Sequence, residues 1–110
     1  MNAEQFATIT TVELAGAVNA NNVNDFEQKL NLAVANHNDP ILLVDMAQVD
    51  FLDSAGLMVL VKAFRLAQSV GRRFILCSLA PSVKMIFELT QLDRVFEIFE
   101  SREMINSSLG

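Results

Sequence analysis

The sequence has few of the residues on which disulfide-bonded domains, metal sites and basic binding surfaces depend. Its 110 residues include one cysteine, one histidine, two prolines, four glycines and no tryptophan or tyrosine. One cysteine excludes an internal disulfide, and one histidine with one cysteine is too few for a zinc site without several carboxylates. The net charge is −5, and no run of lysine or arginine is longer than two residues. Nucleic acid and anionic membranes are therefore not expected as partners.

Hydrophobic residues are abundant but divided into short runs. They make up 52% of the chain and charged residues 19%, which excludes an intrinsically disordered chain. No apolar run approaches the roughly 18 residues of a transmembrane helix. Residues 1–5 contain no basic segment that leads into an apolar one, so we expect no secretory signal and a cytoplasmic protein. A single domain is expected over residues 1–110, monomeric by default.

Short apolar or β-branched runs, typical of strands, alternate with stretches of helical spacing. Residues 41–44 are apolar throughout, which is typical of a strand buried on both faces. We predict strands over 7–14, 41–44, 73–78 and 95–99, a loop over 46–53, and helices that begin near Asn22 and at Ser54, Pro81 and Arg102. This order predicts an α/β fold with a mostly parallel central sheet of four to five strands and helices packed on it.

Local signals add detail to three of these elements. Asn22 with Asp25 approximates a capping box at the start of the first helix. Cys77 has apolar neighbours, so we expect a buried thiol rather than a reactive one. Helical spacing predicts core positions at Val23, Phe26, Leu30, Ala33 and Val34 in the first helix, and at Val83, Ile86, Phe87 and Leu89 in the third.

Residues suited to acid–base, metal or phosphate chemistry are not clustered in this sequence. The only histidine, His37, lies between asparagines and is expected to be a solvated turn residue. No glycine-rich phosphate-binding motif is present. We therefore expect no catalytic residues, no metal and no cofactor, and the protein is not expected to be an enzyme.

Ser54 begins a long apolar-periodic run and is predicted to be the N-cap of its helix. A hydrolase nucleophile would need the pattern Gly-x-Ser-x-Gly, but Leu52 occupies the first glycine position and no histidine is placed to act as base. The serine therefore has two open interpretations, a helix cap or a functional hydroxyl.

The helix that begins at Ser54 has a mixed polar and apolar sector. On a helical wheel the polar members are Ser54, Lys62, Arg65, Gln68 and Ser69, and Met58 and Val61 lie among them. Methionine and arginine are common at protein interfaces, which favours a docking face. The alternative is that a neighbouring loop covers Met58 and Val61.

These residues carry a family resemblance. The run Asp53-Ser54-Ala55-Gly56-Leu57 follows the apolar strand 41–45, and Ala80-Pro81-Ser82-Val83-Lys84 opens the next helix. In this order and spacing, from about Phe6 to Ile105, the chain resembles the STAS domain of bacterial anti-sigma factor antagonists. The resemblance implies a non-enzymatic switch protein in a partner-switching system.

The resemblance also implies partners and site residues. The partner would be an anti-sigma factor that is also a serine kinase with a histidine-kinase-like ATPase fold. That kinase would phosphorylate Ser54, and a PP2C-type phosphatase would remove the phosphate. The unphosphorylated form would bind the anti-sigma factor and release the sigma factor, and phosphoserine would block binding. The implied partner-binding residues are Asn19, Asp53, Ser54, Gly56, Leu57, Met58, Val61, Lys62 and Arg65, with Gly56 allowing close approach of the partner.

The chain departs from the family pattern at two positions. Asn19 stands where many antagonists carry an aspartate near the serine, and Ala55 stands where a second hydroxyl residue often follows it. Ser54 is therefore the only hydroxyl in the motif.

Three other functions remain open at the level of sequence. A STAS module can regulate a partner other than a sigma factor, such as a signalling enzyme or a large stress complex. A small nucleotide-binding domain would use the Asn19–Asn24 loop and the Ser54 loop, which lie where α/β folds bind ligands. A scaffold domain would use Ser54 only as a helix cap.

Overall fold

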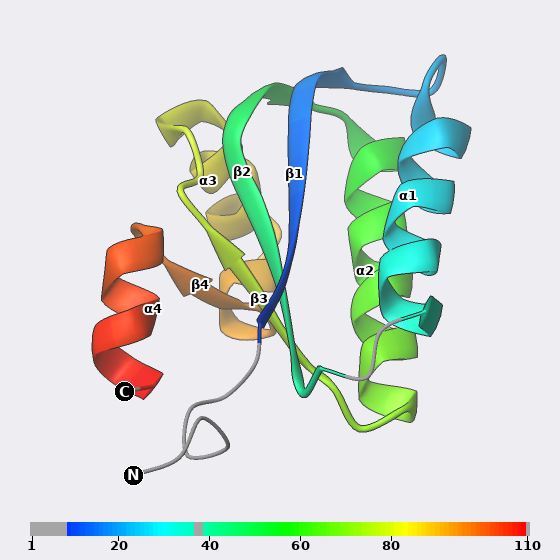
Figure 1. Ribbon diagram of the computed structural model, residues 1–110. Coiled ribbons are helices and arrows are strands. Elements are labelled where there is room, and N and C mark those ends of the chain that lie inside the picture. Colours follow the sequence, from blue (N-terminus) through cyan, green and yellow to red (C-terminus); the bar gives the residue numbers. More distant parts are fainter. Residues whose placement is uncertain (1–8, 37–38, 110) are drawn as a thin grey trace, which may run out of the picture.

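The computed structural model describes residues 9–36 and 39–109, which form a parallel four-stranded sheet in the order β1-β2-β3-β4 with helices on both faces (Figure 1). The predicted α/β fold is confirmed. Along the chain the elements are β1 (Ile9–Val18), α1 (Val23–Asn36), β2 (Ile41–Leu52), α2 (Ser54–Ser69), β3 (Arg73–Cys77), α3 (Pro81–Leu89), the 3-10 turn η2 (Leu92–Arg94), β4 (Glu97–Phe99) and α4 (Arg102–Leu109).

The two central strands are buried on both faces because helices cover both. Side chains along a strand alternate between the faces. Leu42 and Val44 of β2 therefore join the main core with α1, α2 and α3, whereas Ile41 and Leu43 join a smaller core beneath α4. In Figure 1, α1 and α2 lie on one side of the sheet and α4 on the other. The uninterrupted apolar run at 41–44 follows from this double burial.

The predicted helical core positions are correct except at the end of α3. Val83 and Phe87 are buried, but Leu89 is 77% exposed, so its predicted core position is wrong. Leu89 is the last residue of α3, and the chain then reverses through Gln91 with a φ of 62°. After this reversal Phe96 packs against Phe87, with ring centroids 5.4 Å apart, and is itself buried in the main core. The predicted positions in α1 are all buried or half-buried (Val23, Phe26, Leu30, Ala33 and Val34).

Strands β1 and β2 are longer than the sequence pattern predicted. The predicted end of the first strand at Leu14 and the predicted loop at 46–53 are both wrong, because β1 runs to Val18 and β2 to Leu52. The register shifts at two places, so that Ala15 pairs with Gln48 and Ala17 with Phe51. At each place β2 carries one extra residue, which is the geometry of a bulge. The buried positions of β2 then no longer alternate with exposed ones. A search for residues of alternating hydrophobicity therefore could not predict this part of the strand.

Arg72 is buried beside the end of α1 despite its charge. Its Nη1 donates to the carbonyl oxygens of Ala33 at 2.7 Å and Val34 at 2.9 Å, and its Nε donates to the carbonyl of Asp39 at 2.7 Å. The last carbonyls of a helix have no partners within the helix, and a cation there is also favoured by the helix dipole. Arg72 thus joins the start of β3 to the end of α1.

The single cysteine is buried in the smaller core, as predicted. Cys77 is fully inaccessible to solvent, and burial raises the pKa of its thiol above the ordinary value. A raised thiol pKa lowers the fraction of reactive thiolate, so the structural interpretation of Cys77 is supported.

Candidate functional site

Asp53, rather than Ser54, caps the N-terminus of α2. Its backbone N–H donates to the carbonyl of Val18 at 3.1 Å. Its Oδ1 accepts from the N–H of Gly56 at 3.0 Å, and its Oδ2 accepts from the N–H of Ala20 at 3.1 Å. The predicted N-cap role of Ser54 is therefore wrong by one residue. Both oxygens of Asp53 are used within the protein, so this residue positions the site and ties the β1–α1 loop to α2.

Ser54 is the exposed first residue of α2. Among residues 9–36 and 39–109, its hydroxyl makes no hydrogen bond. The first N–H groups of a helix have no partners within the helix and carry partial positive charge. A negative group attached to Ser54 would thus meet a favourable local field, and the hydroxyl is accessible for modification.

The asparagine loop beside Asp53 is held together by its own side chains. Oδ1 of Asn22 accepts from the N–H of Asn19 at 2.9 Å, and Oδ1 of Asn19 accepts from the N–H of Asn21 at 2.9 Å. Nδ2 of Asn22 also donates to the carbonyl of Ala17 at 2.6 Å. The side chain of Asn22 therefore turns back into the loop, which contradicts the predicted capping box with Asp25. Half-buried Asn19 is brought to the same end of the sheet as Ser54.

Gly56 lies inside the protein, where α2 approaches the ends of β1 and β2. A Cβ atom at this position would lie 2.7 Å from Cδ1 of Leu52, 2.8 Å from Cγ1 of Val18 and 3.2 Å from the carbonyl oxygen of Val18. Glycine is required by this internal contact. The expectation that Gly56 gives a partner close access is not supported, because the residue is buried.

Replacing Gly56 with alanine is expected to destabilise the fold. Overpacking of this kind costs about 1–3 kcal/mol, more than the roughly 1 kcal/mol that alanine gains over glycine in a helix. Urea denaturation followed by circular dichroism would measure the change. The exposed Gln68→Ala variant in the same helix is the control, with an expected change below about 0.5 kcal/mol. A Gly56→Ala protein as stable as the wild type would contradict the packing argument.

The exposed side of α2 is apolar near Ser54 and basic further along. Met58 is 54% exposed, so no described loop covers it. Lys62 and Arg65 are also exposed, and Nζ of Lys62 lies 3.9 Å from a carboxylate oxygen of Glu27 in α1. Leu57 and Val61 are half-buried against the main core and border this side of the helix. The structure therefore brings Ser54, Met58, Lys62 and Arg65 to the surface on one element.

Phe51 lies close to Asp53 in the chain, on the face of the sheet away from α2, and was not predicted as a site residue. Its side chain is 51% exposed. Neighbouring Leu52 packs into the core beneath α2, so Phe51 points to the opposite face of the sheet. It pairs in register with Ala17, whose small side chain leaves the ring uncovered. An aromatic residue two positions before Asp53 was the available signal, but the predicted loop concealed its strand geometry.

The described residues contain no group of three or more His, Cys, Asp or Glu side chains that could hold a metal ion. Within the same residues, no helix has the length and hydrophobicity needed to cross a membrane. His37, expected to be a solvated turn residue, lies outside the described residues.

The fold is that of a STAS domain. The family model for this domain matches residues 1–104, and the chain belongs to the STAS domain family. The family resemblance seen in the sequence is confirmed.

Relatives share both the sequence and the fold. A Bordetella bronchiseptica protein, BtrV, whose name describes an anti-sigma factor antagonist, is 30% identical over 90 residues, 82% of this chain and 77% of its own. An anti-sigma factor antagonist structure from Thermotoga maritima has a TM-score of 0.80 at 24% identity and covers 94% of this chain and 93% of its own. SpoIIAA of Bacillus in its phosphorylated form has a TM-score of 0.66 at 19% identity, covering 91% and 90%. The two structural likenesses show the fold.

Proposed function

We propose that this protein is an anti-sigma factor antagonist controlled by phosphorylation of Ser54. The unmodified protein binds an anti-sigma factor and so releases a sigma factor, and phosphoserine at position 54 prevents that binding. The observation that carries the proposal is the exposed Ser54 hydroxyl at the N-terminus of α2, beside a capping Asp53 whose oxygens are already used. The name of the 30% identical relative supports the same function.

The proposed partner is an anti-sigma factor that is also a serine kinase with a histidine-kinase-like ATPase fold. A PP2C-type phosphatase reverses the modification. This chain supplies only the acceptor in such a system: the Ser54 Oγ forms the new bond to the γ-phosphorus of ATP bound to the kinase, and ADP leaves. The protein acts as substrate and ligand.

The proposed docking surface combines two elements that meet at Asp53. The exposed side of α2 contributes an apolar contact next to the serine and basic residues further along the helix. Phe51 at the end of β2 contributes a second apolar contact from the opposite face of the sheet. Interfaces favour this composition, with aromatic, methionine and arginine side chains enriched. Its members are Asn19, Phe51, Ser54, Met58, Lys62 and Arg65, with Asp53, Leu57 and Val61 supporting them from beneath.

The direct test is capture of the partner followed by phosphorylation in a purified system. Immobilised wild-type protein is expected to retain an anti-sigma factor with a kinase-type ATPase domain from a lysate of the organism that encodes it. The purified partner with ATP is then expected to phosphorylate the wild type at Ser54, as located by mass spectrometry, and to leave Ser54→Ala unmodified. Retention of a signalling enzyme or a stress complex in place of an anti-sigma factor would show that the protein regulates that partner and not a sigma factor. Equal phosphorylation of Ser54→Ala would contradict the assigned site.

Phe51→Ala is expected to weaken partner binding with little change in stability. Truncating an exposed aromatic anchor removes interface contacts worth more than about 1 kcal/mol, which corresponds to roughly a tenfold loss of affinity. Isothermal titration calorimetry with the purified anti-sigma factor would measure it. Leu89→Ala, which truncates another exposed hydrophobic residue on α3, should bind normally. Unchanged affinity of Phe51→Ala would remove β2 from the docking surface.

A further inference from the structure

Within residues 9–36 and 39–109, one short helix, α4, covers the face of the sheet opposite the main core. Ile105 of α4 is fully buried in the smaller core with Leu43, Ile75 and Cys77. Helix α4 has 8 residues, fewer than an isolated helix needs to be stable in water. Its folding therefore depends on its contacts with the sheet.

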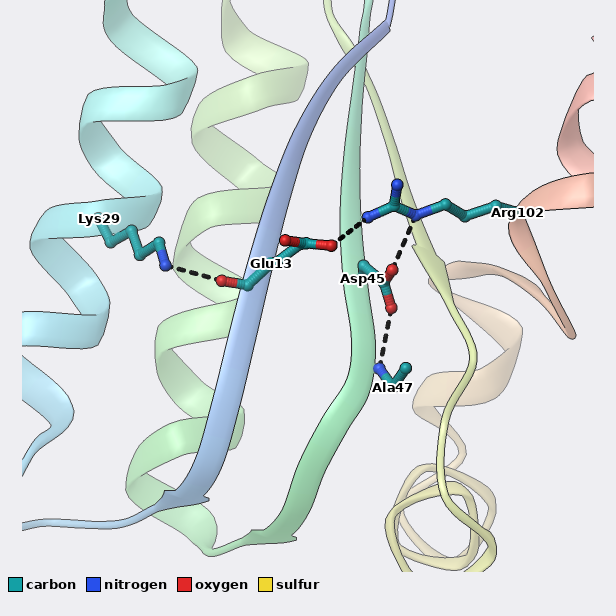
Figure 2. A network of polar contacts seen from close by, with 5 residues as sticks. All are labelled: Glu13, Lys29, Asp45, Ala47 and Arg102. Atoms are coloured by element: carbon teal, nitrogen blue, oxygen red, sulfur yellow. Dashed lines mark hydrogen bonds and ion pairs between the residues drawn. The ribbon is translucent and has the colours of Figure 1, made fainter.

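Arg102, the first residue of α4, joins the helix to β1 and β2. Figure 2 shows its guanidinium between two carboxylates: Nε lies 2.7 Å from Oδ2 of Asp45, and Nη2 lies 2.8 Å from Oε2 of Glu13. Glu13 and Asp45 are register partners on neighbouring strands. Like charges in that arrangement repel each other, so the cation of Arg102 relieves a repulsion built into the sheet.

The carboxylate of Asp45 and the backbone of Glu13 are held in place by contacts that do not involve α4. Oδ1 of Asp45 accepts from the N–H of Ala47 at 2.9 Å, inside the first bulge of β2. Nζ of Lys29 donates to the backbone carbonyl of Glu13 at 2.7 Å, which ties this part of β1 to α1 (Figure 2). The Asp45 acceptor and the strand position of Glu13 therefore do not depend on α4, whereas the Glu13 carboxylate has Arg102 as its partner among the described residues.

We propose that α4 opens and closes on the sheet as a unit while the rest of the domain stays folded, and that Arg102 is the catch that holds it closed. Opening uncovers the apolar residues of the smaller core, including Cys77. The side chains of Arg102 and Glu13 are 40% and 72% exposed, so dissolved salt screens their attraction. The closed fraction consequently depends on ionic strength.

Cys77 offers a direct measurement because it is the only thiol in the chain and is fully covered. Labelling with a thiol reagent under native conditions reports each opening. We expect Arg102→Met to raise the labelling rate about tenfold, which corresponds to about 1.4 kcal/mol, and to lower the free energy of global unfolding by no more than that amount. Labelling without urea should stay far faster than global unfolding allows in both proteins. Added sodium chloride should accelerate labelling of the wild type but not of Arg102→Met.

Two further variants make the result decisive. Arg73→Met removes another arginine–glutamate pair, between β3 and β4 with Glu97, and should label like the wild type. Glu13→Gln removes one of the two ion pairs of Arg102 and leaves the Asp45 contact at the bulge unchanged. It is the alternative test variant if Arg102→Met does not fold. Labelling that follows global unfolding in every variant, or equal acceleration in Arg73→Met, would overturn the proposal. This outcome would leave the docking role of α2 unaffected, because the measurement involves no partner.

Discussion

Ser54→Asp is expected to lower the affinity for the anti-sigma factor about a thousandfold, because burying an unmatched charge at an interface costs several kcal/mol. The serine is exposed at the N-terminus of α2 and next to Asp53, whose carboxylate is already negative. Phosphoserine carries about −1.5 to −2 charges and should act at least as strongly as aspartate.

The fold itself is expected to tolerate the substitution. A negative charge in the first turn of a helix is favoured by the helix dipole by about 0.3–1 kcal/mol. The wild-type hydroxyl makes no hydrogen bond among the described residues, so nothing internal is lost. A loss of binding by Ser54→Asp would therefore report on the interface and not on unfolding.

Titration of the purified partner with four proteins would measure this effect. Wild type and Ser54→Ala should bind with similar affinity, and Ser54→Asn is the neutral control that matches aspartate in shape. Thermal denaturation of each variant would verify that all four are folded. Binding of Ser54→Asp as tight as that of the wild type would argue strongly against a phosphorylation switch at this site.

The second large effect concerns stability: Arg72→Met is expected to destabilise the protein by about 3–5 kcal/mol. Methionine fills a similar volume but leaves the carbonyls of Ala33, Val34 and Asp39 without their donor. A domain of this size has a total stability of about 5–15 kcal/mol, so the variant should be close to unfolding at moderate urea concentrations.

Urea denaturation of Arg72→Met should be compared with Arg73→Met. The adjacent arginine is exposed and pairs with Glu97 at the surface, so its loss should cost no more than about 1 kcal/mol. Arg72→Lys should fall between wild type and Arg72→Met, because one ammonium group cannot reproduce the planar fork of the guanidinium. Equal stability of Arg72→Met and Arg73→Met would show that the buried hydrogen bonds add nothing.

The hydrogen-bond partners of the asparagine-rich loop could not be predicted from the sequence. Local preference correctly indicated a turn between 19 and 24, but not which groups the side chains would bind. In the structure the asparagine side chains bind backbone groups of the loop itself. The backbone N–H of Ala20 binds Asp53, which lies 33 positions away in the sequence. Such a contact depends on how β1 and β2 pair and leaves no local signal.

Hydrophobic spacing and helix-breaking residues were sufficient to establish the order of elements, the doubly buried strand at 41–44, the core face of α1 and the start of α3 at Pro81. These features are short-range, because strand and helix periods and capping preferences involve residues only a few positions apart. The motif around Ser54 and the family resemblance also follow from a short run of residues.

The bulges of β2, the inward role of Gly56, the exposure of Phe51 and the catch formed by Arg102 became visible only in the folded chain. Each depends on the register between two strands or on a contact between distant segments. Glu13 and Arg102, for example, are 89 positions apart and meet across the sheet. One extra residue in a strand moves every following side chain to the other face, so the composition of the surface near Ser54 was decided by tertiary pairing.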